Sequence, residues 1–299
     1  MDEAVPLRIA TAFGPSRDKT LLLAMHPDEA FERGKARPDR RTLVLSLKGT
    51  KATFQEERPM ALVRSWYSTG SGVAYCTGIT TNTLYKWQAG KWSDENFSAS
   101  PAKSVRFIFG LPGATPEDDQ LFLASADGLF IRTKGTWTQH SLGGDKTPYQ
   151  IHGRSPAEVF IGGETLHKWN GATVEEIDGP DDGDIIDALW VTSDDRLVGG
   201  DSEMSITEAD GSWSPLAVPA VNYGNLEEFR GIIFASSGDG VAQVLPPLPD
   251  LVSPPAALAR IVNVGDALIA IGNDVALVGD GTTWSAIQVP SCEVGKRPR

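Results

Sequence analysis

The chain of 299 residues contains few of the residues on which most metal and catalytic sites depend, with two cysteines and four histidines. Cys76 and Cys292 are too few for a disulfide framework and lack metal-ligand spacing. The histidines are far apart and form neither an HxH nor an HExxH motif. We therefore predict no catalytic set, no metal site and no cofactor.

Long hydrophobic runs and an excess of positive charge are also missing. No apolar run approaches the roughly 20 residues of a membrane span, and the first residues, MDEAVPLRIATAF, carry acids where a secretory signal needs basic residues. With 27 lysines and arginines against 39 acids, the net charge is -12. A nucleic-acid partner is disfavoured because phosphate binding needs a basic face. We expect a cytoplasmic protein without a membrane partner.

Short strands and turns fill the chain, and no long helical pattern interrupts them. The segment from Val159 to Ile177 holds two short apolar runs joined by a Gly-Gly turn and a third run after Asn-Gly, which predicts three antiparallel strands. The same pattern returns from Tyr75 to Phe97, from Leu121 to Leu142 and from Leu268 to Val289. A repeat of about 40 residues made only of strands and turns is typical of a β-propeller, an all-β fold.

A glycine that precedes the outer strand of each unit, usually one to three residues before a tryptophan, sets the number of blades. These glycines recur at intervals of about 40 residues, and one interval of about 70 fits two units. The spacing predicts seven four-stranded antiparallel blades in one domain over residues 1–290, with a frayed tail over 291–299. In the sixth blade, LPPLPDLVSPP replaces the outer hairpin, so its outer strand is short, an edge or missing. If that segment is only a linker, six blades remain an alternative.

The repeat resembles bacterial propeller units of the BNR and WD40-like superfamilies. The resemblance is carried by the TLYKW and TLHKW strands and by the GxW turns, in which the tryptophan is expected to fill the gap between blades. The Gly-His and Trp-Asp dipeptides of WD40 repeats and the Ser-x-Asp-x-Gly-x-x-Trp box of sialidases are absent. The resemblance therefore implies the propeller fold and transfers no activity to any residue.

One position of the expected innermost strands is rich in arginine. The third residue of PLRIAT, LVRSWY, SVRFIF, PYQIHG and LARIVN is arginine or glutamine, and a repeated inner position would form a ring around the central channel. One hypothesis is an anion site at the channel mouth; the alternative is that the arginines pair with carboxylates of neighbouring blades. His152 is expected to be a hydrogen-bonded neutral imidazole. The candidate ligand-binding residues are Arg8, Arg64, Arg106, Gln150, His152 and Arg260.

Two loops break the symmetry of the repeat. HPDEAFERGKARPDRR interrupts the first blade with mixed charge, and long loops in compact domains are usually functional or mobile. EEIDGPDDGDIID joins blades four and five without the order of an EF-hand, so we interpret it as a solvated acidic loop rather than a calcium site. Together with PEDDQ it could give an acidic surface for a basic partner. The candidate partner-binding residues are Asp28, Glu29, Phe31, Glu32, Arg33, Asp118, Asp119, Asp181, Asp182 and Asp184.

These patterns favour a non-catalytic binding protein. We expect a rigid disc that presents its rim and loops to another protein, as a scaffold subunit or as an inhibitor or immunity-type protein. The alternative is a propeller that binds a small anion, or a lyase or hydrolase, at an arginine-lined channel mouth. The sequence leaves the oligomeric state open.

Overall fold

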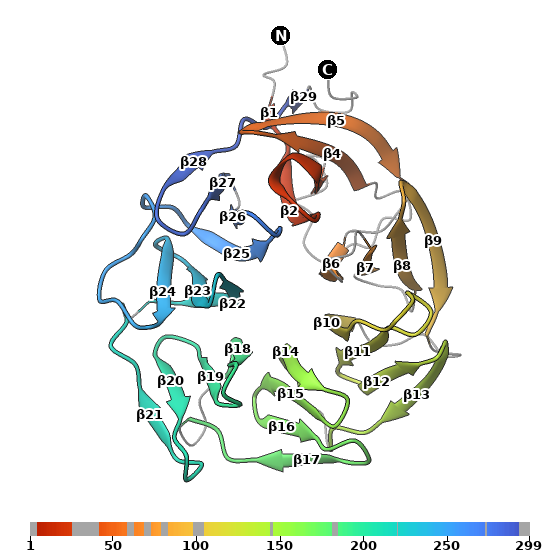
Figure 1. Ribbon diagram of the computed structural model, residues 1–299, viewed down its shortest axis with the longest axis vertical. Helices are drawn as coiled ribbons and strands as arrows, with labels where there is room; N and C mark the ends of the chain where they lie inside the picture. The colour runs from red at the N-terminus through yellow and green to blue at the C-terminus, as the bar shows by residue number, and fades with distance from the viewer. Residues whose placement is uncertain are drawn as a thin grey trace.

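The computed structural model is a seven-bladed β-propeller, with the blades arranged as a closed disc around a central channel (Figure 1). It describes residues 5–25, 42–58, 63–68, 73–78, 83–97, 105–143, 146–180, 185–219, 221–272 and 274–292. Six blades are four-stranded antiparallel sheets and one has three strands. The predicted all-β class and the predicted count of seven blades are confirmed.

Each blade is a run of consecutive strands, so no blade combines strands from the two ends of the chain. Blades one to four comprise β2 (Arg8–Phe13), β3 (Thr20–Met25), β4 (Thr42–Lys48) and β5 (Lys51–Arg58); β6 (Val63–Ser68), β7 (Val73–Gly78), β8 (Thr83–Gln88) and β9 (Lys91–Asn96); β10 (Val105–Leu111), β11 (Gln120–Ser125), β12 (Gly128–Thr133) and β13 (Thr136–His140); and β14 (Pro148–Ser155), β15 (Glu158–Gly163), β16 (Leu166–Trp169) and β17 (Val174–Ile177).

The remaining blades follow the same plan, and a short ribbon lies outside the blades. They comprise β18 (Ala188–Val191), β19 (Leu197–Gly200), β20 (Met204–Thr207) and β21 (Trp213–Pro215); β22 (Tyr223–Phe229), β23 (Ile232–Ser237) and β24 (Val241–Leu245); and β25 (Leu258–Asn263), β26 (Leu268–Gly272), β27 (Ala276–Gly279) and β28 (Trp284–Ala286), with the ribbon formed by β1 (Val5–Pro6) and β29 (Ser291–Cys292). Between β2 and β3 lies a single 3-10 turn, η1 (Arg17–Lys19).

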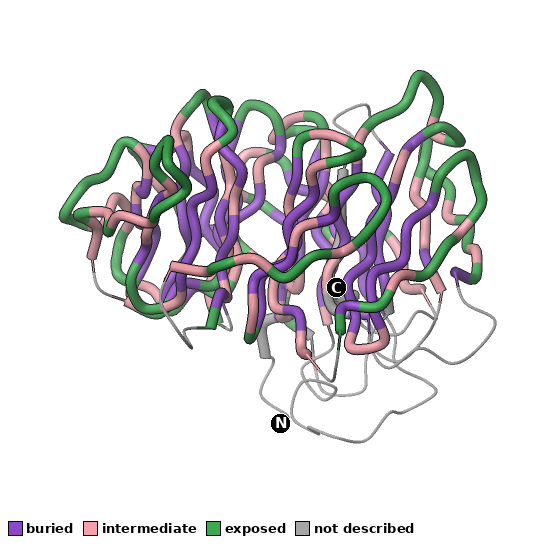
Figure 2. Tube along the Cα trace, turned by 90° about the horizontal axis from the view of Figure 1, so that it is seen from below, coloured by how far each residue is buried: buried purple, intermediate pink, exposed green. Residues whose placement is uncertain are grey.

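The position of a strand within its blade determines its hydrophobic pattern. The second strands, such as β11 and β15, are buried along nearly their whole length because both faces of a blade pack against neighbouring blades. The outermost strands, such as β9 and β17, are largely exposed and carry charged residues. Figure 2 shows the buried strands inside the disc and the exposed turns around them. This is why the apolar runs of the sequence mark the middle of each unit.

The GxW turns of blades two and three are tight hairpins with consecutive residues at positive φ. Ala89 and Gly90 have φ of 50° and 79°, and Lys134 and Gly135 have φ of 49° and 77°. Such turns match the twist of the flanking strands. The tryptophan that follows packs toward the preceding blade: the Trp92 ring meets Phe13 of blade one at 6.2 Å, and Trp137 Nε1 donates to Glu95 of blade two at 3.0 Å. The predicted role of these tryptophans between blades is confirmed.

Blade six lacks a fourth strand, as its proline-rich segment predicted. β24 is the outer strand of a three-stranded sheet, and the following segment touches its edge through an isolated bridge between Ala242 and Leu251. The Val252 amide donates to the Val241 carbonyl at 2.8 Å, and the Leu248 amide donates to the Gln243 carbonyl at 3.2 Å. The blade therefore keeps a covered edge without a regular strand.

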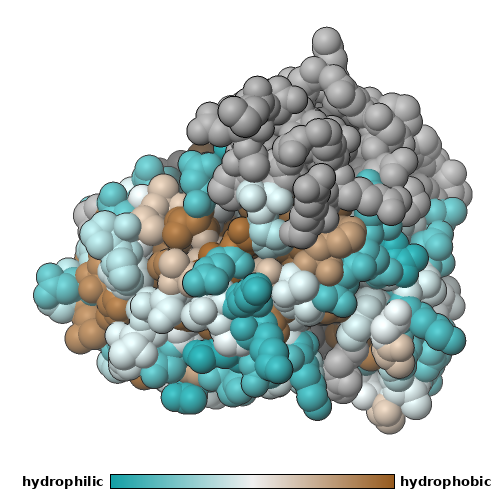
Figure 3. All heavy atoms as spheres, turned by 90° about the horizontal axis from the view of Figure 1, so that it is seen from above, coloured by the Kyte–Doolittle hydropathy of each residue, from teal (hydrophilic) through white to brown (hydrophobic). Residues whose placement is uncertain are grey.

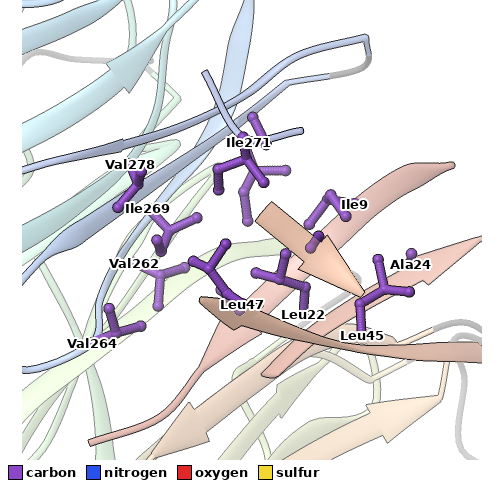
Figure 4. Close-up of a cluster of buried hydrophobic side chains, with 14 of the residues drawn as sticks. Ile9, Leu22, Ala24, Leu45, Leu47, Val262, Val264, Ile269, Ile271 and Val278 are labelled. Carbon is purple, nitrogen blue, oxygen red and sulfur yellow. The ribbon is translucent and has the colours of Figure 1, made fainter. Parts of the chain in front are cut away.

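Blade one closes against blade seven mainly through packing. A hydrophobic cluster that joins the two blades includes Leu22, Leu45, Ile269 and Val278, all fully or nearly fully buried (Figure 4). Outside the blades, β1 pairs with β29. The expected mixture of packing and strand pairing is thus observed. The predicted frayed tail, however, begins too early, because residues 291–292 take part in this pairing.

Candidate functional site

The innermost strands of the seven blades surround the central channel. β2, β6, β10, β14, β18, β22 and β25 each contact the next one around the ring, and β25 returns to β2. All seven lie in the segments that the sequence placed innermost. Each of them pairs on one side only, so the backbone groups of its other edge face the channel or a side chain of a neighbouring blade.

The expected ring of arginines is not a single structural position, because β-bulges shift the register of the inner strands. Arg64 and Arg106 are themselves the extra residues of bulges in β6 and β10. Arg260 instead follows the bulge of β25, and Gln150 follows that of β14. Arg8 precedes the bulge of β2. The idea of one repeated ring position is therefore wrong, since a bulge moves every later side chain along by one.

Five of the inner strands enclose a cavity in the channel, which we call the channel cavity. Its volume is about 220 Å³, and its walls come from β10, β14, β18, β22 and β25. Three predicted residues, Gln150, His152 and Arg260, line it together with Trp190 and Glu227. The structure thus brings half of the predicted ligand-binding set to one place.

Of the other three predicted arginines, only Arg8 has a described side chain. Arg8 lies 3.6 Å from the Asp274 carboxylate of blade seven, which is the inter-blade pairing expected under the structural alternative. Asp274 is largely exposed, so this ion pair is weak. The side chains of Arg64 and Arg106 lie outside the described residues.

His152 joins blade four to blade five as a neutral imidazole. Its Nδ1 accepts a hydrogen bond from the Val191 amide at 2.9 Å, so the ring proton is on Nε2. The ring stacks on Trp190 at 3.8 Å and contacts Phe109 at 5.1 Å. Burial, with a smaller effect of Arg154, lowers the pKa of His152 to about 3. The prediction of a hydrogen-bonded neutral histidine is confirmed.

Glu227 is a titratable residue of the channel cavity that the sequence interpretation missed. Burial, assisted by repulsion from Glu228, raises the pKa of the Glu227 carboxyl to about 8, although a hydrogen bond from the Asn263 backbone opposes the shift. The acid is therefore mostly protonated at neutral pH. A signal existed in LEEFRG, where two acids stand on a predicted inner strand.

Blades six and seven are joined by two asparagines at the wall of the same cavity. Asn225 Oδ1 accepts from the Ile261 amide at 2.7 Å, and its Nδ2 donates to the Ile261 carbonyl at 2.9 Å. In the reverse direction, Asn263 Nδ2 donates to the Glu228 carbonyl at 2.7 Å. Their amides satisfy backbone groups that no strand pairs, which keeps this wall rigid.

A second candidate site is the acidic turn between β10 and β11, which we call the blade-three turn (residues 112–119). Asp119 is only 3% exposed. Its Oδ1 accepts from the Gly113 amide at 2.8 Å, and its Oδ2 accepts from the Tyr75 hydroxyl of blade two at 2.8 Å. Asp119 therefore anchors the turn and does not belong to an exposed acidic surface, contrary to expectation. Asp118 and Glu117 are exposed, as expected of Asp118.

The blade-three turn and the acidic connection between blades four and five do not share a face. The turn joins the first two strands of its blade, whereas residues 178–187 run from an outermost strand to the next innermost strand. Because strand direction alternates within a blade, these two kinds of connection lie at opposite ends of the strands. The described parts of the two segments therefore lie on different faces of the disc, and a common acidic surface that includes Asp181, Asp182 and Asp184 stays a prediction. Outside the described residues lie Asp28, Glu29, Phe31, Glu32, Arg33, Asp181, Asp182 and Asp184.

Metal binding and membrane crossing find no support within the described ranges. Among those residues, no group of three or more histidine, cysteine, aspartate or glutamate side chains could hold a metal ion. No helix in the same part of the chain is long and apolar enough to cross a membrane. Cys76 is buried as a free thiol, and burial raises its pKa.

Comparison with known proteins identifies the fold. No protein-family profile and no curated protein matches the sequence. Among solved structures, a streptogramin B lyase is similar with a TM-score of 0.63 at 16% identity, covering 76% of this chain and 83% of the lyase. YCF48 bound to a D1 peptide is similar with a TM-score of 0.62 at 14% identity, covering 91% and 93%. Sqt1 of Saccharomyces cerevisiae is similar with a TM-score of 0.62 at 12% identity, covering 97% and 98%.

These neighbours are β-propellers, and at such identities they establish the architecture alone. They include a lyase and a protein captured with a peptide. The same disc thus serves different activities, and the function must be argued from the surface of this chain.

Proposed function

We propose that this chain is a non-catalytic protein-binding propeller of the cytoplasm, a scaffold subunit or an inhibitor or immunity-type protein that meets its partner through turns on the faces and rim of the disc. The observation that carries the proposal is the blade-three turn. It presents exposed carboxylates on a backbone held in place by a buried one.

The blade-three turn is fixed from two blades. The Tyr75 hydroxyl of blade two lies 2.9 Å from the Pro116 carbonyl as well as close to Asp119. Arg132 Nη1 donates to the Asp119 carbonyl at 3.3 Å, and Arg132 Nε lies 2.9 Å from Glu95 Oε1 of blade two. A turn that is rigid before binding loses little conformational entropy when it meets a partner.

The exposed chemistry of this turn selects a basic or hydrogen-bonding partner segment. The Asp118 carboxylate accepts only from the Thr115 hydroxyl, at 2.9 Å, among the bonds within the described chain. Glu117 lies 3.4 Å from Lys86, and this contact lowers the pKa of Glu117 after the larger effect of its own backbone amide. Glu117 is thus ionised at neutral pH, and the two exposed carboxylates can pair with lysine or arginine.

The rest of the visible surface is compatible with a polar contact. Among the described residues, Ile185 and Leu248 are the large hydrophobic side chains that are exposed, each by 40%. On the rim shown in Figure 3, hydrophobic residues are interrupted by hydrophilic ones. A broad apolar interface is therefore absent from this described surface, and charged turns supply the specificity. The peptide held by YCF48 is a precedent for the architecture, at low identity.

The test is a comparison of complexes captured from the source cells by the full chain and by a charge-reversed variant. Native mass spectrometry of the wild type is expected to show a retained protein. The double variant Glu117→Lys with Asp118→Lys should retain at least tenfold less of it, while Asp250→Lys, an exposed acid on blade six, serves as the matched control. Equal retention by all three proteins would place the partner elsewhere, and the absence of any protein partner would overturn the proposal.

A further inference from the structure

The outer hairpin of blade four contains the one Asn-Gly pair of the 299-residue sequence, Asn170-Gly171. Asparagine amides are among the thermally labile groups of proteins, and a following glycine has no Cβ to keep its backbone nitrogen away from the asparagine side chain. Each of the other six asparagines precedes a residue with a side chain. Asn170 and Gly171 are exposed between β16 and β17, the two outer strands of the blade (Figure 1), so water reaches them. By sequence and exposure, this pair is the position of the chain most open to deamidation.

Deamidation at this pair is a cyclisation followed by hydrolysis. The Gly171 backbone nitrogen attacks Asn170 Cγ and gives up its proton, and Nδ2 leaves as ammonia, which forms a five-membered succinimide ring. Water then adds to one of the two ring carbonyls and opens the ring to aspartate or to isoaspartate. The net change is one water consumed, one ammonia released and one negative charge gained, with no other reactant.

The Asn170 side-chain amide is held by four hydrogen bonds within the turn. Its Oδ1 accepts from the backbone amides of Ala172 at 3.0 Å and Thr173 at 2.9 Å. Its Nδ2 donates to the Thr173 hydroxyl oxygen at 3.0 Å and to Glu175 Oε1 at 2.6 Å. Both protons of Nδ2 and both acceptor positions of Oδ1 are thus used. The amide plane cannot turn toward Gly171, and Nδ2 cannot depart, until these bonds break.

The backbone around the reacting bond is fixed as well. Closing the succinimide ring changes the backbone dihedral angles where Asn170 joins Gly171. Gly171 has φ of 94°, and an added Cβ would lie 2.9 Å from Ala157 Cβ, so this turn lies against the turn between β14 and β15. Trp169 is 5% exposed, and its Nε1 donates to the Pro156 carbonyl of the same neighbouring turn at 2.9 Å. Ring closure therefore depends on local opening of the hairpin end.

Blade seven shows how an acid is accommodated at the same position of its own turn. Asp280 Oδ1 accepts from the Thr282 and Thr283 amides at 2.9 and 2.8 Å, the same pattern as that of Asn170 Oδ1. An aspartate at position 170 would thus keep the acceptor bonds, but Glu175 would lose its donor and face a like charge. Isoaspartate also inserts a methylene into the backbone. Modification here therefore loosens the start of β17.

From these contacts we infer that Asn170-Gly171 is a modification site gated by the outer hairpin of blade four. The closed turn, in which Thr173 and Glu175 hold Nδ2, restrains the reaction, and deamidation proceeds through the open hairpin. Each event adds a negative charge to the outer edge of the blade and loosens the start of β17. The inference is independent of the blade-three turn and of any protein partner.

The experiment follows deamidation of the full chain at mildly alkaline pH beside a synthetic peptide of residues 165–176. Cleavage after glutamate yields peptides that begin at Thr165, and mass spectrometry measures the conversion of amide to acid at Asn170. The folded chain should react at least roughly tenfold more slowly than the peptide, because only its open fraction reacts. A rate in the folded chain equal to or above that of the peptide would overturn the inference, since the turn would then leave the reaction unrestrained or promote it.

Variants test the hydrogen bonds that hold Nδ2. Glu175→Ala removes the acceptor of the 2.6 Å bond and should speed deamidation of the folded chain by roughly threefold or more, whereas Glu175→Gln keeps an acceptor and should lie closer to the wild type. Glu176→Ala removes the same charge from the next residue of β17 and is the matched control, with an unchanged rate. Synthetic peptides with these changes should all react alike.

Thermal unfolding checks that each variant is folded, and Thr173→Val, which removes the other acceptor of Nδ2, gives a second test of the same kind. Unchanged rates in the folded Glu175→Ala and Thr173→Val variants, or an equal acceleration by Glu176→Ala, would overturn the assignment of the gate to these bonds.

Discussion

At the residue scale, the polar side chains near the channel mainly complete the backbone hydrogen bonding of a neighbouring blade. Asn225 meets both backbone groups of Ile261, and His152 accepts from the Val191 amide. These partners are 36 and 39 residues apart in the chain, about one blade. The sequence showed the spacing of the blades, but it could not show which side chain crosses to the next one.

Replacing Asn225 with leucine should destabilise the protein. The Ile261 side chain is fully buried, and its amide and carbonyl would both lose their partner. Leaving a buried polar group unpaired costs about 1–3 kcal/mol, so the expected loss for the pair is about 3 kcal/mol. Urea unfolding measures it, with Asn96→Ala as an exposed control on β9 that should lie within about 0.5 kcal/mol of the wild type. A neutral Asn225→Leu would show that this clamp contributes no stability.

Glu227 should make the protein less stable as the pH rises. Its pKa is about 8 in the folded chain against an ordinary 4.5, so between these values the folded state holds a proton that the unfolded state has lost. Stability from this group is complete below about pH 4.5 and is lost as the pH rises through 8. Glutamine stays neutral at every pH. Over the range from pH 5 to 8, the free energy of unfolding of Glu227→Gln should therefore rise relative to that of the wild type by on the order of 2 kcal/mol. Parallel pH curves of the two proteins in urea unfolding would disprove the shift.

At the element scale, strand order was predictable and strand register was not. The apolar second strands and the GxW turns identified every blade, including the incomplete sixth one. The bulges of the inner strands could not be predicted, because Arg64 and Arg106 are ordinary strand residues by sequence and become bulge residues only where the pairing skips. This is why the five similar inner-strand positions did not become one ring.

The turn of blade two offers a stabilising substitution. Ala89 adopts φ of 50°, a left-handed conformation that alanine disfavours and asparagine tolerates, and Gly90 follows it. Ala89→Asn creates the preferred Asn-Gly hairpin turn and should stabilise the protein by about 0.5–1 kcal/mol. Thermal unfolding measures the change. Ala89→Val, which is β-branched, should shift stability in the opposite direction, and a loss with asparagine would contradict this account of the turn.

At the scale of the whole molecule, the seam between blades one and seven holds the disc closed. Gly265 in blade seven has φ of 84° and lies so close to Pro15 of blade one that an added Cβ would overlap the Pro15 carbonyl oxygen. Next to it, the Arg17 amide donates to Asp266 Oδ1 at 2.6 Å. Close backbone approach, rather than strand exchange within a blade, therefore brings the two ends of the ring together.

Gly265→Ala should strain this seam through both the positive φ and the close backbone contact. The same substitution at Gly211 isolates the effect of the positive φ. Gly211 has nearly the same φ, 86°, but nothing lies within 4 Å of its added Cβ. Gly211→Ala should cost about 1 kcal/mol from conformation alone, whereas Gly265→Ala should cost about 3 kcal/mol because backbone must also shift. Both are measured by urea unfolding. Equal losses would mean that the seam is loose enough to absorb a methyl group.

The pairing of β1 with β29 brings the two ends of the described chain side by side (Figure 1), and every blade between them is continuous in sequence. The breakpoint of the ring thus interrupts no blade, and the β1–β29 ribbon and the close approach at Gly265 are what distinguish this seam. A circular permutant that joins residue 292 to residue 5 through a short linker and opens the chain between blades three and four would keep every blade intact. The position of the termini is therefore a replaceable feature of this protein, available as an attachment point for a fused domain.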